Sequence, residues 1–284
     1  RATMKIVVRT SLCMGLIAGL VLATLAACEL QTATPPQGRS GDQLAWAGRT
    51  WTVKGGPDLF GPGPNYFSQD VASAYTDDQG FLHLNIRQID GKWHCSEIIS
   101  NDVVGYGTYT WEVQSNMMDI TENTVLGLFT WDNNTFFAQA NSEVDIEFSR
   151  WGDPNKVKTL ATSVQPVWFG AFFAERTHET QLPPEAKTMW TTHEFTWTDS
   201  LITWTSYLGA KSANNVIASW SFDDSNPARR KSEGGVQSNP IVIPAPGPTT
   251  NARLNLWLFE GQDSGPSIGG AYEVVIRNFS YQPL

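Results

Sequence analysis

The sequence predicts an all-β protein built as a two-sheet β-sandwich or jelly roll. Short segments rich in β-branched and aromatic residues alternate apolar and polar side chains with a period of two, which is the pattern of half-buried strands. No long window shows helical periodicity, and glycine and proline interrupt the whole length. Many short strands separated by turns are typical of two packed sheets, because each sheet then buries the apolar face of the other.

Seven segments carry the strand pattern most clearly. They span residues 81–86, 109–113, 125–129, 193–197, 202–207, 253–258 and 272–276. A chain of 284 residues with 41% hydrophobic content can form one large core, and all-β domains of this size are often undivided. We therefore expect one folded domain over residues 42–284. Residues 223–251 form a long irregular segment within it, which is either a solvated excursion or a functional or mobile loop.

The first residues have the pattern of an export signal. Lys5 and Arg9 supply positive charge, and the apolar stretch 14–23 that follows is too short to span a bilayer comfortably. The next residues, 25–28, read LAAC and resemble the bacterial lipoprotein box. That resemblance implies a signal peptide over residues 1–27 and a lipid on the thiol of Cys28.

The residue after this cysteine is Glu29, which favours the outer membrane over retention in the inner membrane. The small residues before the cysteine also suit an ordinary signal peptidase, so a freely secreted protein is the alternative. Residues 28–41 are polar and rich in proline and glycine, and they predict a flexible tether. The expected membrane contact is therefore through a lipid anchor.

Charge and composition argue against several other functions. The net charge of −9 disfavours nucleic-acid binding, which needs clustered lysine and arginine, but it is compatible with a neutral polysaccharide. Three cysteines are too few for a disulfide framework, and Cys95 is expected to be a small buried side chain. The four histidines have no metal-ligand spacing, and neither a G-x-S-x-G motif nor a phosphate-binding glycine loop is present. We expect a monomer without a metal or another cofactor.

One segment, SEVDIEFSRWG at residues 142–152, carries the clearest functional signal. Glu143, Asp145 and Glu147 occupy alternate positions, so on an extended strand they share one face. The apolar residues between them take the other face and should pack between the sheets. Three unpaired carboxylates would be very costly in a core, so their face must meet water or a ligand.

Crowded carboxylates suit the cleavage of a glycosidic bond. A carboxyl group beside other carboxylates keeps its proton to higher pH, so one glutamate can serve as an acid while another stays ionised. The backbones of Glu143 and Glu147 lie roughly 13 Å apart on a strand. Their side chains must lean together to reach the ~5–5.5 Å separation of retaining glycosidases. Asp145 can then hydrogen-bond to the nucleophile, although spacing alone does not say which glutamate has which role.

The stretch from Glu143 to Phe148, EVDIEF, resembles the signature of glycoside hydrolase family 16. The resemblance implies a concanavalin-like jelly roll with a carbohydrate-binding cleft. It also implies that Glu143 is the nucleophile, that Asp145 assists it and that Glu147 is the acid/base. The unbulged motif is more similar to those of lichenases and xyloglucan enzymes than to that of laminarinases. A structural calcium is common in that family, but no ligand set for it can be read in this sequence.

The resemblance covers most of the chain from about residue 45. The stretches that carry it are GPGPNYF at 61–67, LHL at 82–84, EIIS at 97–100, GYGTY at 105–109 and NLW at 255–257. They imply that Trp257 lines the cleft and that Glu97 and Gln165 lie near it. Two departures concern sugar binding: Asn141 stands where lichenases have tryptophan, and Ile99 stands where they have arginine.

Four further candidates for sugar binding follow from their places in the sequence. Trp131 ends the strand before the carboxylate strand, and Trp151 lies just beyond that strand. Asn65 and Tyr66 lie on a Gly/Pro loop that could close over the sugars. For any single tryptophan a core position is the alternative, since sandwich cores also use tryptophan.

The sequence therefore predicts a retaining endo-β-glycosidase that hydrolyses internal bonds of a β-glucan-type polysaccharide. A transglycosylase with the same covalent intermediate is the first alternative. A polysaccharide-binding lipoprotein without activity is the second. The sugar and its linkage stay open.

Overall fold

The computed structural model describes residues 38–168, 170–223, 225, 241–261, 263 and 265–284, which belong to one compact unit. The expected signal peptide, the expected lipidation site at Cys28 and most of the expected tether lie outside these residues. So does the central part of the irregular segment predicted over residues 223–251. In the described part of the chain, no helix has the length and apolar character needed to cross a membrane.

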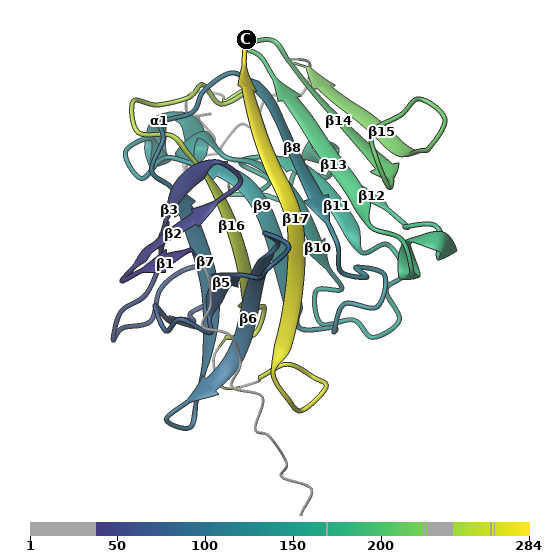
Figure 1. Ribbon diagram of the computed structural model, residues 1–284. Helices are drawn as coiled ribbons and strands as arrows, with labels where there is room; N and C mark the ends of the chain where they lie inside the picture. The colour runs from purple at the N-terminus through teal and green to yellow at the C-terminus, as the bar shows by residue number, and fades with distance from the viewer. Residues whose placement is uncertain (1–37, 169, 224, 226–240, 262, 264) are drawn as a thin grey trace, which may run out of the picture. The chain divides into compact units, whose positions relative to one another are not determined.

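Two antiparallel layers of strands make up the fold (Figure 1). In spatial order the first layer contains β5 (Ala74–Thr76), β6 (Leu82–Ile89), β17 (Tyr272–Pro283), β8 (Gly107–Val113), β13 (Thr191–Trp197), β14 (Leu201–Leu208) and β15 (Val216–Asp223). The chain crosses between neighbours that are distant in sequence, as in a jelly roll, so that β8 lies between β17 and β13.

The second layer carries the candidate site. In spatial order it contains β1 (Arg39–Ser40), β2 (Gln43–Trp46), β3 (Arg49–Val53), β7 (Lys92–Ser100), β16 (Asn251–Leu258), β9 (Thr124–Trp131), β10 (Val144–Ser149), β11 (Leu160–Val164) and β12 (Thr177–Thr180). The hairpin between β6 and β7 joins the two layers, and β4 (Tyr66–Phe67) pairs in parallel with β7.

In the part of the chain that the structure describes, helical structure is limited to single turns between strands. The described residues contain α1 (Phe136–Gln139) and the 3₁₀ turns η1 (Ala140–Ser142), η2 (Ala174–Arg176) and η3 (Pro184–Lys187). All seven strands predicted from sequence are present, so the all-β prediction is confirmed. The expected tether, however, ends earlier than residue 41, because Arg39 and Ser40 already pair with β2.

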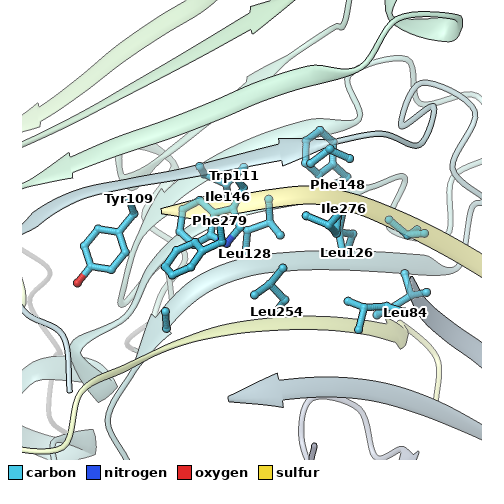
Figure 2. Close-up of a cluster of buried hydrophobic side chains, with 14 of the residues drawn as sticks. Leu84, Tyr109, Trp111, Leu126, Leu128, Ile146, Phe148, Leu254, Ile276 and Phe279 are labelled. Carbon is cyan, nitrogen blue, oxygen red and sulfur yellow. The ribbon is translucent and has the colours of Figure 1, made fainter. Parts of the chain in front are cut away.

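Apolar side chains from both layers form one continuous core. Ile146 and Phe148 of β10 are buried in it together with Leu128 of β9, and they face aromatic residues of the first layer such as Trp111 and Phe279 (Figure 2). The apolar positions of the carboxylate strand therefore point into the sandwich, as the alternation predicts. Cys95 is also fully buried in this core, and burial raises the pKa of its thiol to about 12.

The surface of the first layer contains a histidine between two carboxylates. His83 Nδ1 lies 2.9 Å from Glu273 Oε1, and its Nε2 lies 3.2 Å from Asp77 Oδ2. The ring stacks on Tyr75 with 4.7 Å between centroids. The hydrogen bond to Glu273 and then the bond to Asp77 raise the pKa of His83 above its ordinary value of 6.5, against the effect of partial burial.

We predict that this cluster stabilises the fold more at mildly acidic than at alkaline pH. Because the folded pKa of His83 is raised, its contribution is complete below the unfolded pKa of about 6.5 and is lost as the pH rises through the folded value. His83→Gln should therefore lower the free energy of unfolding by up to about 1 kcal/mol at pH 6 and by less at pH 9.

Urea unfolding at the two pH values measures this difference. His94→Gln on the neighbouring strand is the control, since its Nδ1 lies 3.0 Å from the backbone carbonyl of Lys92 rather than beside a carboxylate. An equal loss for His83→Gln at pH 6 and pH 9 would contradict the prediction.

Candidate active site

The three carboxylates meet at a cavity on the face of the second layer that is turned away from the core. Glu143 directly precedes β10, and Asp145 and Glu147 belong to it. All three line a cavity of about 510 Å³. The other lining residues come from β7, β16 and β9, from Lys54 after β3, and from the connections at residues 60–62 and 133. The predicted clustering of the acids on one accessible face is therefore present.

Strand register places a row of side chains beside Glu147. Glu147 pairs with Gly127 of β9, Gly127 pairs with Asn255 of β16, and Asn255 pairs with Glu97 of β7. Residues directly opposite one another on antiparallel strands project to the same face, so this row forms the cavity floor. Gly127 is needed there, because a Cβ atom at this position would lie 2.4 Å from Asn255 Oδ1.

Asn255 is a cavity residue that the sequence reasoning did not select. Its side chain is 3% exposed, and Oδ1 has no hydrogen-bond partner among the described residues. A buried carboxamide without full hydrogen bonding is costly unless a ligand or water completes it. The signal was present in the sequence as the NLW stretch, but only its tryptophan was considered.

Glu97 is held at the cavity floor by two cations. It is 1% exposed, and its carboxylate lies 2.8 Å from Lys54 Nζ and 3.1 Å from Arg253 Nη1. The guanidinium of Arg253 lies above the ring of Trp131, 5.6 Å from its centroid. The prediction that Glu97 lies near the cleft agrees with this position, whereas Lys54 and Arg253 were missed because their partners are distant in sequence.

Arg253 also clarifies the departure at Ile99. The two residues are directly opposite each other on β16 and β7, and both line the cavity. The neighbouring strand thus supplies a guanidinium directly opposite Ile99.

Burial raises the pKa values of all three acids, and repulsion by neighbouring carboxylates raises those of Glu143 and Glu147 further. Desolvation is the larger cause for Glu147, with the charge of Asp145 second, and its pKa is about 8. The pKa of Asp145 is about 7, raised by desolvation and lowered by hydrogen bonds with Gln165 and Glu143. Desolvation, followed by the charges of Asp145 and Glu147, also holds the pKa of Glu143 well above its usual range, while Arg253 acts in the opposite direction. Repulsion was expected as the main cause, but burial exceeds it.

A hydrogen bond connects two of the acids. Glu143 and Asp145 share a side-chain hydrogen bond, which requires a proton on one carboxyl group. Gln165 Nε2 donates to Asp145 Oδ2 at 2.9 Å, and Gln165 Oε1 accepts from the backbone N–H of Val167 at 2.9 Å. Gln165 thus contacts the acids as predicted, although it orients Asp145 and does not itself line the cavity.

Some of the predicted aromatic and loop residues line the cavity, and the others pack elsewhere. Trp131 and Trp257 line the cavity. Trp151 does not; it packs edge-on against Trp257 with 6.3 Å between ring centroids. Asn65 is fully buried and Tyr66 packs against Lys92 and His94, so neither lines the cavity.

Asn65 nevertheless fixes part of the cavity wall. Its Nδ2 donates to the carbonyl oxygens of Pro62 and Leu258, both at 2.9 Å. Gly61 and Pro62 line the cavity, and Leu258 ends β16, so one amide joins the loop to the sheet. The expectation of a sugar contact from Asn65 is replaced by a structural role.

An unusual backbone precedes Glu143. Ala140, Asn141 and Ser142 have φ values of 44°, 60° and 55°, a left-handed run of three residues other than glycine. Such residues cost of order 1 kcal/mol or more each, and asparagine tolerates this region better than bulky residues do. This conformation gives a reason for Asn141 at the position where lichenases have tryptophan.

A single hydroxyl group fixes the backbone on both sides of Glu143. Thr130 Oγ1 donates to the carbonyl oxygen of Ser142 at 2.8 Å and accepts from the N–H of Val144 at 3.2 Å. Ser142 Oγ in turn donates to the carbonyl oxygen of Ala245 at 2.7 Å. Thr130 is fully buried, so this clamp is shielded from water.

The first layer also supports the carboxylate strand. Trp204 of β14 donates its indole N–H to the backbone carbonyl oxygen of Asp145 at 3.1 Å, and its ring stacks on Trp220. Within the described ranges, no group of three or more His, Cys, Asp or Glu side chains is arranged to hold a metal ion. The site as described is therefore a cluster of carboxyl groups positioned by hydrogen bonds.

Comparisons with known proteins identify the fold. The sequence matches no family model and no curated protein. Among solved structures, the β-glucanase of Bacillus licheniformis is similar, with 15% identity, a TM-score of 0.55, and coverage of 88% of this chain and 96% of that chain. A lichenase from a mouse hindgut metagenome has 14% identity, a TM-score of 0.53, and coverage of 87% and 95%.

A Flavobacterium laminarinase is also similar, with 12% identity, a TM-score of 0.55, and coverage of 81% of this chain and 92% of that chain. At these identities the similarity concerns the fold. The chain has the jelly-roll fold of these β-glucanases over nearly their whole length.

We predict that the carboxyl groups titrate as a coupled cluster. Replacing Asp145 by asparagine removes a negative charge beside Glu147, so the pKa of Glu147 should fall toward its usual range, by about one unit or more. Carboxyl-carbon NMR titration of the unaltered protein and of Asp145→Asn measures the change. Asp102→Asn, at an exposed surface position, is the control. An unchanged titration of Glu147 in Asp145→Asn would show that the two groups do not interact.

Proposed function

We propose that this protein is a retaining endo-β-glycosidase that cleaves internal bonds of a β-glucan-type polysaccharide. The observation that carries the proposal is the row of Glu143, Asp145 and Glu147 along one wall of a cavity, with raised pKa values. Supporting it, the solved structures of similar fold include β-glucanases, a lichenase and a laminarinase. The division of chemical roles among the acids follows the resemblance of the EVDIEF segment to glycoside hydrolase family 16.

Glu147 is suited to be the general acid. With a pKa of about 8 it holds its proton at neutral pH, and it can donate that proton to the glycosidic oxygen as the bond to the leaving sugar breaks. After the leaving group departs, the ionised Glu147 can accept a proton from water. That water attacks the anomeric carbon and releases the enzyme carboxylate.

The resemblance assigns Glu143 as the nucleophile. In the resting site the hydrogen bond with Asp145 raises the pKa of Glu143 and lowers that of Asp145, so the shared proton has to pass to Asp145 before Glu143 attacks the anomeric carbon. Asp145 then donates a hydrogen bond to the attacking carboxylate. Arg253 favours the ionised form of Glu143. The Thr130 clamp and the bond from Gln165 to Asp145 hold both groups in place, which limits the reorganisation needed during reaction.

The charges in the cavity bear on the substrate. Three acids face the bound sugar, and both cations are already paired with Glu97. A neutral polysaccharide fits this environment better than a sulfated one. Trp131 and Trp257 offer aromatic surfaces at the two ends of the cavity for sugar rings. We keep export and a lipid on Cys28 as part of the proposal on the basis of the sequence pattern alone.

Glu143→Gln tests the assignment of the nucleophile. The substitution preserves size and removes the attacking charge, so hydrolysis of lichenan or laminarin should fall by at least about a thousandfold while the thermal unfolding midpoint stays close to that of the unaltered protein. NMR of the first product released by the unaltered protein should show retention of the β-anomer. Initial inversion would exclude the double-displacement mechanism.

Thr130→Val tests the clamp around Glu143. Valine matches the shape of threonine but removes the hydroxyl group that bonds both Ser142 and Val144. We expect kcat on a β-glucan to fall by about tenfold or more with little change in KM, because the position of Glu143 matters most in the transition state. Thr130→Ser should restore most of the rate.

Thr192→Val is the matched control for this test. Thr192 is a buried threonine of β13 whose hydroxyl donates to the carbonyl oxygen of Gly209 at 2.7 Å, in the other layer. Its loss should cost similar stability without an effect on kcat. If kcat falls in both Thr130→Val and Thr192→Val in proportion to the stability that each loses, the proposed positioning role of Thr130 is refuted.

A further inference from the structure

Strongly exposed aromatic side chains of the described residues lie on connections at the two ends of the second layer. Those more than a third exposed are Phe136, Phe137, Trp168, Phe172 and Phe259. The first two lie between β9 and β10, the next two between β11 and β12, and the last directly after β16. All five therefore lie on connections of strands that form the cavity or border its carboxylate strand. Four of them lie at the end of the layer where β9 and β11 end and β10 begins, whereas Phe259 lies at the opposite end, because Leu258 pairs with Thr124 at the start of β9. Exposed apolar rings collected at one end are typical of a binding surface.

Trp168 and Phe172 lie on the connection that is hydrogen-bonded to the acids through Gln165. Their backbones form an antiparallel bridge, so the two rings project to the same side of the connection. Their side chains are 68% and 58% exposed. Two exposed rings thus lie on one side of this connection.

This segment is joined firmly to the carboxylate strand. Gln165 connects Asp145 to the N–H of Val167, and the N–H of Gln165 donates to the carbonyl oxygen of Glu143 at 3.2 Å. On its other side the fully buried Arg176 donates to the carbonyl oxygens of Val164 and Gln165 at 3.2 and 3.0 Å. The position of the aromatic pair is thus set relative to the acids.

The cavity occupies only one side of the acids. Its lining residues belong to β7, β16, β9 and β10 and to adjoining connections, and none comes from β11 or β12. On the other side of β10, Ser163 lies opposite Asp145 and Ala161 opposite Glu147, and both side chains are small and share the face of the acids. An enzyme that cuts inside a chain must hold sugars on both sides of the broken bond, so one set of sugars has to lie over β11.

We propose that Trp168 and Phe172 form a binding platform for pyranose rings on the leaving-group side of the carboxylates. The inference rests on the proposed glycosidase function and extends it. The C–H faces of the sugars would stack on the two rings, next to the floor formed by Ala161 and Ser163. Glu147, opposite Ala161, is the acid that meets the glycosidic oxygen from this side.

The platform also gives a place for a sugar acceptor. Once the first leaving group has gone, an oligosaccharide bound there can present a hydroxyl group to the anomeric carbon. Its oxygen then forms the new glycosidic bond, Glu147 takes its proton, and the ester bond to Glu143 breaks. Transfer of the glycosyl group to an oligosaccharide would therefore accompany hydrolysis whenever an acceptor occupies the platform.

Variants of the two rings test the platform in the full protein. Trp168→Ala, Phe172→Ala and their combination should leave folding intact, because both side chains are mostly exposed. The double variant should lower kcat/KM on lichenan or laminarin by about tenfold and reduce transfer to added cello-oligosaccharides by a similar factor. Cleavage of a 4-nitrophenyl β-oligoglucoside, whose small leaving group does not need the platform, should stay within about twofold.

Two control variants test whether the effect on transfer is limited to rings on the β11 side of the acids. Phe259→Ala removes an exposed ring next to Trp151 on the Trp257 side, and Val216→Ala removes an exposed apolar side chain on β15 of the other layer. Neither should change the ratio of oligosaccharide transfer to hydrolysis. An equal loss on the 4-nitrophenyl substrate and the polysaccharide, or no loss on either, would overturn the platform.

A binding measurement separates this inference from the proposed activity. Electrophoresis through gels containing lichenan or laminarin, with Glu143→Gln as the background, should show retardation that Trp168→Ala/Phe172→Ala weakens and Val216→Ala does not. Equal retardation of all three would refute the platform. If the unaltered protein cleaves neither the polysaccharides nor the 4-nitrophenyl substrate, the glycosidase proposal fails, and the gel result alone then decides whether the rings bind sugar.

Discussion

The removal of three neighbouring carboxyl groups from water is the constraint on which the site depends. Burial raises the pKa values of Glu143, Asp145 and Glu147, and repulsion by neighbouring carboxylates adds to this effect for Glu143 and Glu147. An arrangement of this kind is costly unless other groups offset it; here Gln165 donates a hydrogen bond to Asp145, and the charge of Arg253 favours the ionised form of Glu143. Burying these groups lowers the stability of the folded protein, but the same burial lets a carboxyl group keep its proton at neutral pH.

Contacts from both layers of the jelly roll hold the carboxylate strand in position. Neighbouring strands pair with β10 on both edges, Thr130 fixes the backbone around Glu143, and Trp204 reaches across from the other layer. The apolar alternate residues of the same strand are packed in the core. One face of the six-residue strand β10 therefore packs in the hydrophobic core, and the other face carries the carboxyl groups. Hydrogen bonds from Thr130 and Ser142 offset the strain of the left-handed backbone at residues 140–142.

Local pattern was sufficient to predict the strands and the common face of the acids, because a period of two determines both. Contacts between distant residues were not predictable in the same way. The guanidinium of Arg253 takes its place only through the pairing of β16 with β7, and the amide of Asn65 meets Leu258 across 193 positions. Tyr66 was expected near sugars because its loop has a suggestive composition, yet its ring packs on Lys92. Composition identifies a loop, but only register and packing decide where its side chains lie.

The indole bond from Trp204 to the backbone of Asp145 has a consequence for how such a protein can diversify. The reactive groups are tied to the interior of the sandwich, whereas the exposed rings belong to short connections outside it. Under the proposed function, substitutions of the exposed rings are therefore expected to change which polymer binds while leaving the positions of the carboxyl groups unchanged.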